Sequence, residues 1–305
     1  MHPLLHIGYH RTGTTWLQKC VFRNAKAGFT FVAGGKTLRP AFIEVDHFRF
    51  DPEIARRKIE PGIRKAQARS LVPVLSAERL SGNPHFSSHD SEAIAVRLAA
   101  TFPDARVLVG IREQTSMLVS LYKQYVKRGG AVSFRRYAAA APGRHGAPPF
   151  PFDHLEYHHL IGHYQNLFGA ANVLVLPYEL LCVQPRAFLE QLGEFLGVLA
   201  TSAESRKMNV SPSALSLSLK RHANRYVVRD KFNPDPLIAL DGSNEVLLRI
   251  CRKLDARAPM ALRDGYERRL RRYAEREVGD RYVESNALTV KLTGIDLQAF
   301  GYACA

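Results

Sequence analysis

A stretch near the N-terminus, LLHIGYHRTGTTW at residues 4–16, has the residue types and spacing of a phosphate-binding loop. An apolar run ends at Gly8, and five residues later Gly13 leads into two threonines. In the frame Gly-x-x-x-x-Gly before a helix, backbone N–H groups converge on an anion. A tight strand-to-helix turn capped by threonines is the alternative, but it leaves the basic residue in the loop, Arg11, unexplained.

The cation of this loop is displaced from the position used by nucleoside-triphosphate sites. Such sites place a lysine after the second glycine to reach the β- and γ-phosphates, with a hydroxyl on Mg²⁺. Here that position is Thr14, and Arg11 lies three places earlier, at the crown of the loop. There it would face the bridging oxygen of a 5'-phosphate group. A sulfuryl donor carries less charge at the transferred centre than ATP, so one cation and backbone dipoles would suffice without a metal.

A second phosphate-binding pair follows about a hundred residues later. The apolar run VLVGI ends just before Arg112, and Ser120 lies eight residues further on, within two turns of a helix that begins near Gln114. An arginine at a strand end and such a hydroxyl can bind one phosphate together. Either residue alone would be an unremarkable surface position.

A candidate general base, Glu78, follows the apolar run LVPVLS at 71–76. In a parallel sheet ligands gather at the carboxyl ends of the strands. Transfer to a hydroxyl requires a base that takes the acceptor's proton. The alternatives are a histidine, His85 or His89, as base, and a purely structural Glu78 paired to a neighbour such as Arg79.

The loop GYHRTGTTWLQ resembles the 5'-phosphosulfate loop of sulfotransferases that use 3'-phosphoadenosine 5'-phosphosulfate (PAPS). That loop typically reads Pro-Lys-Ser/Thr-Gly-Thr-Thr-Trp, so that His10 replaces Pro and Arg11 replaces Lys. The resemblance implies that Arg11 binds the 5'-phosphosulfate and assists departure of the leaving group, and that the only tryptophan stacks on adenine. The implied loop contacts are Arg11, Thr12, Gly13, Thr14, Thr15 and Trp16.

Three further segments carry the resemblance, which covers most of residues 4–200 and fades beyond 215. The family's 3'-phosphate signature is an Arg at a strand end with a Ser eight residues later, which implies that role for Arg112 and Ser120. The segment NVLVLPYE places Tyr178 at the adenine edge, and the loop SRKMNVS places Arg206 and Lys207 over the 3'-phosphate. Carbohydrate sulfotransferases use a Glu after the corresponding strand as base, which favours Glu78.

Alternating apolar runs and helical patterns predict a single α/β domain with a central, mostly parallel sheet flanked by helices. The resemblance implies a P-loop-like, nucleoside-kinase-like fold, with a nucleotide-binding core at about 1–200 and a helical part at about 201–305. A Pro/Gly/Ala-rich stretch at 138–152 is expected to be a mobile loop. The predicted strands are 4–9, 29–32, 71–76, 105–110 and 172–176. The predicted helices are 13–25, 91–101 (capped by Asp90 or Ser91), 114–127, 153–167 and 185–196, with several in 212–288.

The composition of the chain indicates which kinds of molecule it could bind and where it could act. The 305 residues contain 43 Lys plus Arg and 28 Asp plus Glu, a net charge of +15 that attracts anions. No RNA-binding or zinc-finger motif accompanies this charge, so no nucleic acid is expected. Four dispersed cysteines and no 18-residue apolar run favour a cytoplasmic protein with reduced thiols, for which peripheral membrane contact stays open. The oligomeric state is undetermined.

The expected reaction is therefore sulfuryl transfer from PAPS to a hydroxyl of a carbohydrate, glycolipid or small metabolite, with 3',5'-adenosine bisphosphate (PAP) as product. The basic charge favours an acidic sugar or glycolipid. A P-loop kinase and a non-catalytic nucleotide- or anion-binding protein are the alternatives. No metal is expected: histidines recur at 154, 158, 159 and 163, but without the His-Glu-x-x-His pattern, and they are interpreted as the rim of a helix that packs Leu155, Leu160 and Ile161 inward.

Overall fold

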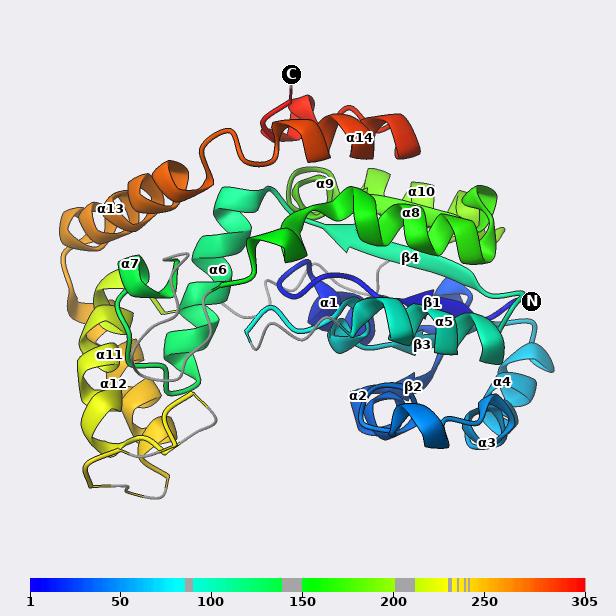
Figure 1. Cartoon of the computed structure of the whole chain (residues 1–305), viewed down its shortest axis with the longest axis horizontal. Helices are drawn as coiled ribbons and strands as arrows, with labels where there is room; N and C mark the ends of the chain where they lie inside the picture. Colours follow the sequence, from blue (N-terminus) through cyan, green and yellow to red (C-terminus); the bar gives the residue numbers. More distant parts are fainter. Residues whose placement is uncertain are drawn as a thin grey trace.

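The computed structural model of the chain describes residues 1–85, 90–138, 150–200, 212–229, 232–234, 236–238, 240 and 242–304. Figure 1 shows a sheet surrounded by helices, with a group of C-terminal helices to one side. Arg206, Lys207 and His89, as well as most of the loop predicted at 138–152, lie outside the described residues. Of that loop, Phe150 and Phe152 are buried in the core.

Five strands form one fully parallel sheet, as the apolar runs predict. Its order is β2-β3-β1-β4-β5, so that β1 lies in the middle. Strand β1 is shorter than predicted, yet the N–H groups of Ile7 and Tyr9 still bond to β4. The strands are β1 (Leu4–His6), β2 (Phe29–Gly34), β3 (Val72–Ser76), β4 (Arg106–Ile111) and β5 (Val173–Pro177).

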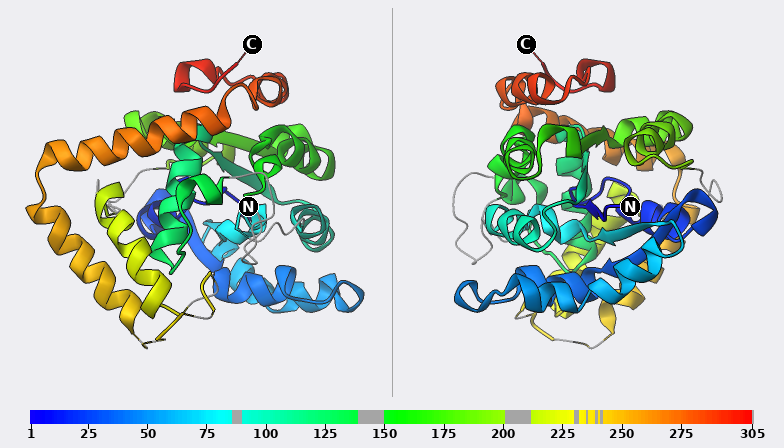
Figure 2. Two further views of the ribbon diagram at one scale, coloured as in Figure 1. Left: turned by 60° about the vertical axis from the view of Figure 1, so that its left-hand side comes forward. Right: turned by 90° about the vertical axis from the view of Figure 1, so that its right-hand side faces the viewer.

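The strands bury both faces because successive side chains point to opposite sides. Leu5 and Val107 face one core, and Leu4 and Leu108 face the other. Figure 2 shows helices on both sides of the sheet. The first core is covered by α5 (Ser91–Thr101), α6 (Gln114–Lys127) and α8 (Tyr157–Phe168). The second is covered by α9 (Tyr178–Val183), α10 (Pro185–Leu196) and a π-helical turn at Leu17–Val21.

Helices near the C-terminus extend the first core along α6 (Figures 1 and 2). Helices α11 and α13 pack on α6, α12 packs on α11, and α14 packs on α8. The buried ammonium of Lys220 joins three of them: it donates to the Val126 carbonyl at 3.3 Å, to Asn224 at 2.6 Å and to Asn244 at 2.7 Å. The bounds are α11 (Ala214–Val227), α12 (Ser243–Arg257), α13 (Met260–Val278) and α14 (Val283–Thr293).

Short elements complete the connections between the sheet and the long helices. They are α1 (Thr14–Trp16), α2 (Gly35–Leu38), α3 (Pro52–Arg57), α4 (Glu60–Gln67), α7 (Phe134–Tyr137) and the 3-10 turn η5 (Glu78–Ser81). No helix among the described residues is both long and apolar enough to span a membrane.

Three helix predictions need correction. The helix predicted at 153–167 is a 3-10 turn at Phe152–Leu155 followed by α8, which begins only at Tyr157. The helix predicted at 13–25 is a short α-turn that widens into the π-helical turn and ends at Val21. Asp90 stands at the N-cap of α5, but its carboxylate does not cap the helix because it binds the guanidinium of Arg79 instead. The helices at 91–101, 114–127 and 185–196 have the predicted bounds.

Candidate active site

The carboxyl ends of four neighbouring strands carry four of the predicted site residues. The sheet order β3-β1-β4-β5 places Glu78, Arg11, Arg112 and Tyr178 in that sequence along one edge. Contacts between neighbours follow the same order. Arg11 and Glu78 interact electrostatically, Arg112 Nη1 donates to the Arg11 carbonyl at 3.1 Å, and the Arg112 guanidinium lies 4.7 Å from the centre of the Tyr178 ring. Residues far apart in sequence thus form one site.

The loop after β1 is closely packed and conformationally demanding. A side chain at Gly8 would come within 2.9 Å of His6 Nε2. Gly13 has φ 84°, and a Cβ there would meet Leu181 of α9 at 2.6 Å. Arg11 itself has φ 68°, a left-handed conformation that is uncommon for a non-glycine residue and is typical of functional loops. This conformation places Arg11 at the crown of the loop.

Hydrogen-bond donors of the loop divide into two groups. The Thr12 hydroxyl donates to the Tyr9 carbonyl at 2.6 Å, so its side chain holds the loop together. By contrast, the Thr14 hydroxyl is buried and has no hydrogen-bond partner among the described residues. Among those residues the backbone N–H groups of Thr12 to Thr15 also have no acceptor. A buried hydroxyl and several N–H groups that require acceptors fit an anion with several oxygens.

The two predicted phosphate-binding pairs meet through Arg11. Its Nε donates to Ser120 Oγ at 2.8 Å. Arg112 does not bond to Ser120; its Nε donates to Ser116 Oγ at 2.8 Å. The sequence predicts that Arg112 and Ser120 bind one phosphate together. In the structure each of them forms a hydrogen bond with Arg11, which lies between them. Burial and the positive charge of Arg112 both lower the pKa of Arg11.

The predicted adenine-binding residues border one apolar cluster. Trp16 and Tyr178 are both partly buried and pack against the second core, beside Leu17 and Leu181. Tyr178 also lies below the Arg112 guanidinium, as described above. Both rings are thus close to the phosphate loop.

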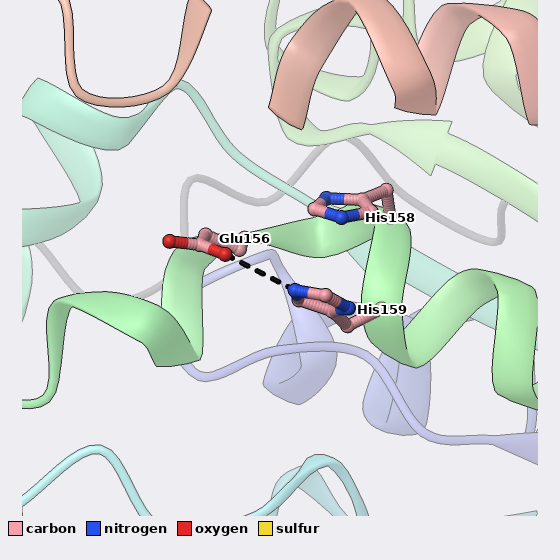
Figure 3. A group of neighbouring side chains, drawn as sticks. All are labelled: Glu156, His158 and His159. Atoms are coloured by element: carbon pink, nitrogen blue, oxygen red, sulfur yellow. Dashed lines mark hydrogen bonds and ion pairs between the residues drawn. The ribbon is translucent and has the colours of Figure 1, made fainter. Parts of the chain in front are cut away.

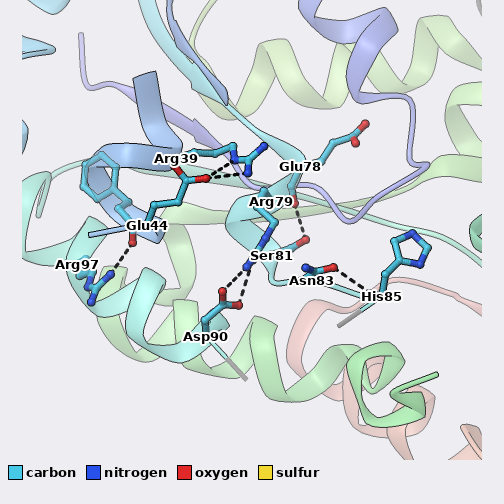
Figure 4. Close-up of polar contacts among 10 residues, drawn as sticks. Arg39, Glu44, Glu78, Arg79, Ser81, Asn83, His85, Asp90 and Arg97 are labelled. Atoms are coloured by element: carbon cyan, nitrogen blue, oxygen red, sulfur yellow. Dashed lines mark hydrogen bonds and ion pairs between the residues drawn. The ribbon is translucent and has the colours of Figure 1, made fainter. Parts of the chain in front are cut away.

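Glu78 is a partly buried carboxylate at the first residue of η5. Burial raises its pKa, and the nearby Arg11 and Arg128 guanidinium groups partly oppose this rise. Among the described residues its carboxylate forms no hydrogen bond or ion pair, and Figure 4 shows it pointing away from the pair formed by Arg79 and Asp90. The structural alternative therefore does not hold in the form of an ion pair between Glu78 and Arg79, and the role of Glu78 as base stays a prediction.

The histidine alternative for the base is weakened by burial. Burial lowers the pKa of His85 to about 3, with further contributions from Arg128 and His154. Its Nδ1 is 3.3 Å from the Tyr137 hydroxyl. Such an imidazole is neutral and only weakly basic near neutral pH. Burial lowers the pKa of His10 and His154 as well, the latter to about 4, and His10 is influenced by both His85 and His154.

The sequence reasoning missed two cations at the end of α6, Lys127 and Arg128. Arg128 acts electrostatically on Glu78, and Lys127 interacts with Arg11. A signal was present: Lys127 follows Ser120 by seven residues and therefore lies on the same helical face. The family signature includes only Ser120 on this helix, so it did not indicate a role for Lys127.

The interpretation of the histidine-rich segment as a helix rim holds for His158, His159 and His163, which lie on α8 and are exposed or partly buried. His154 precedes α8 and is partly buried, and Leu155, Leu160 and Ile161 pack inward as predicted. The ligand atoms of Glu156, His158 and His159 lie within 4.8 Å of one another (Figure 3). His159 Nε2 and Glu156 Oε2 are 3.1 Å apart. Glu156 and His158 are partly buried and His159 is exposed. The absence of a metal in the reaction stays a prediction.

Comparisons with known proteins were consistent. A model described as the sulfotransferase family matches residues 3–201. A sulfotransferase structure from Alicyclobacillus acidocaldarius is similar with TM-score 0.50 and 18% identity, covering 74% of this chain and 93% of that one. The sulfotransferase domain of the Synechococcus PCC 7002 olefin synthase matches with TM-score 0.41 and 14% identity, covering 85% and 96%. The sulfotransferase domain from the curacin biosynthetic pathway matches with 0.36 and 15%, covering 65% and 74%. No curated protein sequence matches. The first structure confirms the predicted P-loop-like α/β fold.

Proposed function

The chain belongs to the sulfotransferase family, and from this premise we propose that it transfers the sulfuryl group of PAPS to an acceptor hydroxyl. The observation that supports the proposal best is the row of Glu78, Arg11 and Arg112 at the carboxyl ends of β3, β1 and β4. This row places a candidate base on one side of the loop cation and a second guanidinium on the other. A base, an oxyanion-stabilising cation and a phosphate clamp are the groups that the reaction needs.

The donor would bind across the loop as a substrate. Arg11, the buried Thr14 hydroxyl and the N–H groups of Thr12 to Thr15 would hold the 5'-phosphosulfate. Arg112 and Ser120 would hold the 3'-phosphate. Trp16 and Tyr178 would hold the adenine, since both rings border the apolar cluster next to the loop. Arg206 and Lys207 are proposed to add positive charge over the 3'-phosphate.

The reaction would proceed by in-line transfer. Glu78 takes the proton of the acceptor hydroxyl while the hydroxyl oxygen forms a bond to sulfur. The bond between sulfur and the bridging oxygen breaks, and its electron pair stays on the 5'-phosphate, where Arg11 stabilises the developing charge. The products are a sulfate ester and PAP. Burial of Glu78 favours this role because a raised pKa makes the carboxylate a stronger base.

The two parts of the chain would have different roles in the reaction. Residues 1–200 would form the nucleotide-binding core, and the helical part at 201–305 would complete the acceptor side. The direct experiment incubates the protein with PAPS labelled in its sulfuryl group and a panel of hydroxyl compounds in EDTA. Appearance of a labelled sulfate ester with stoichiometric PAP supports the proposal. A requirement for Mg²⁺ and ATP, with label left in PAPS, would contradict it.

A further inference from the structure

A cavity of about 210 Å³ lies beside Arg11, the cation of the phosphate-binding loop, between α6 and helices α11 and α12. This is well above the ~10–15 Å³ that one water needs. The polar residues that line it are Arg11, Lys123, Gln124, Lys127, Arg128 and Asn244. The remaining lining comes from apolar side chains of the C-terminal helical part.

Three of the six polar lining residues, Lys123, Gln124 and Lys127, come from one face of α6. Ser120, Lys123, Gln124 and Lys127 are spaced by three, four and seven residues from the first, so they lie along the same side of the helix. At one end of this face Ser120 accepts the hydrogen bond of Arg11. Arg11 therefore belongs both to the wall of the cavity and to the candidate active site.

The charges of the cavity are only partly balanced. Lys123 is neutralised, because its Nζ is 2.7 Å from both carboxylate oxygens of Glu267. Lys127 and Arg128 form no ion pair with the described residues. Burial and the adjacent guanidinium groups of Arg11, Arg252 and Arg128 lower the pKa of Lys127, which shows that like charges crowd together here. An anion among them would relieve this repulsion.

The cavity and the candidate base share two neighbouring cations. Arg11 and Arg128 both line the cavity, and both act electrostatically on Glu78. An acceptor whose hydroxyl reaches Glu78 and whose other end enters this cavity would place that end beside Lys127 and Arg128. The buried Oε1 of Gln124, which has no partner among the described residues, adds an acceptor for a hydroxyl or amide N–H of that molecule.

We propose that this cavity is an acceptor subsite for an anionic group, and that the acceptor is a hydroxyl-bearing acid such as a uronic acid or a phosphorylated or sulfated sugar. The inference rests on the proposed function and adds the substrate class. Lys127 and Arg128 bind the acid, and Gln124 helps to orient the ring that carries it. The competing occupant is the 3'-phosphate of the donor itself, which the following test separates.

The experiment measures binding by calorimetry in two steps. First, PAP is titrated into the wild type, Lys127→Gln and Lys253→Gln proteins in EDTA; Lys253 is an exposed lysine of α12 and serves as the matched control. Second, each PAP-saturated protein is titrated with acid and neutral partners of the same size: p-nitrophenyl glucuronide against p-nitrophenyl glucoside, and glucose 6-phosphate against glucose.

We expect all three proteins to bind PAP with similar Kd. At least one acidic compound should bind the PAP-saturated wild type about tenfold or more tightly than its neutral partner, and Lys127→Gln should remove this preference while Lys253→Gln keeps it. Neutral partners that bind as well as the acids, no binding of either acid, or acid binding that is independent of Lys127 would overturn the inference. So would a loss of PAP affinity in Lys127→Gln, which would assign the cavity to the nucleotide. Failure of the wild type to bind PAP in the first step would instead reject the proposed function.

Discussion

Arg11 Nε donates a hydrogen bond to Ser120 Oγ at 2.8 Å, joining two residues that are 109 positions apart. Arg11 belongs to the loop proposed for the 5' end of the donor, and Ser120 to the helix proposed for the 3' end. The donor is the Nε–H of the guanidinium group, which a lysine lacks. This bond gives a structural reason for an arginine, in place of a lysine, at position 11.

The first prediction is that Arg11 and Ser120 are energetically coupled in PAP binding. Arg11→Lys and Ser120→Ala should each weaken PAP binding, the former by about tenfold because the planar fork is lost. The double variant should lose less than the two single losses combined, with a coupling energy of about 0.5–3 kcal/mol. Calorimetric titration of PAP into the four proteins gives the cycle. Losses that add to within about 0.5 kcal/mol would show that the hydrogen bond has no role in binding.

The second prediction concerns the base. Glu78→Gln keeps the size and polarity of the side chain but cannot accept the acceptor's proton. We expect kcat to fall by about 10²–10⁴-fold while the Kd for PAP changes little. Glu53→Gln, at an exposed position of α3, is the matched control and should leave kcat unchanged. Normal turnover of the Glu78→Gln protein would transfer the role to another residue, for which His85 is poorly suited because of its low pKa.

The third prediction concerns the direction in which kcat/KM changes with pH. Glu78 must be ionised to act, so kcat/KM should rise with pH through a pKa that lies above the ordinary carboxyl value of 4.5. Arg128 lowers that pKa by favouring the carboxylate. Arg128→Gln should therefore move the acidic limb of the profile to higher pH, and Glu78→Gln should abolish the limb. A limb that stays in place, or moves to lower pH, would disagree with the proximity of these two groups.

The fourth prediction tests the loop. Gly13→Ala imposes a left-handed conformation on alanine, at about 1–2 kcal/mol, and adds a Cβ 2.6 Å from Leu181. Gly197 has φ 70° but open space around it, so Gly197→Ala carries the conformational cost alone. Urea unfolding should show the larger loss for Gly13→Ala, by about 1–3 kcal/mol, and only this variant should weaken PAP binding. Equal losses in the two variants would mean that the contact with Leu181 relaxes freely.

The sheet was predictable because its strands are nearly continuous apolar runs. All five runs became strands, and the segments that follow four of them carry the candidate site. The row of Glu78, Arg11, Arg112 and Tyr178 needed the sheet order as well, and strand order is not encoded in local periodicity. The direct bond between Arg11 and Ser120 was not predictable either, since it depends on the left-handed backbone at Arg11.

The remaining differences arise from tertiary contacts that override local signals. Asp90 has the residue type of a helix cap, but the nearby Arg79 guanidinium binds its carboxylate more strongly than backbone N–H groups do. His154 has the spacing of a helix-rim residue, but the chain enters α8 only at Tyr157, and the segment before it is buried against Tyr9. The role of the cations in the cavity could not be predicted because it depends on α11, which packs on α6, and on α12, which packs on α11, and no sequence motif indicates this packing.

The central claim is that the loop binds a 3'-phosphorylated adenosine nucleotide without a metal. Thermal unfolding of the wild-type protein in EDTA, with and without PAP, tests it most directly. At about 100 times Kd, PAP should stabilise the fold by about 2.7 kcal/mol and raise Tm by about 5 °C, whereas ATP with Mg²⁺ should have little effect. Stabilisation by ATP with Mg²⁺, but not by PAP, would contradict the account.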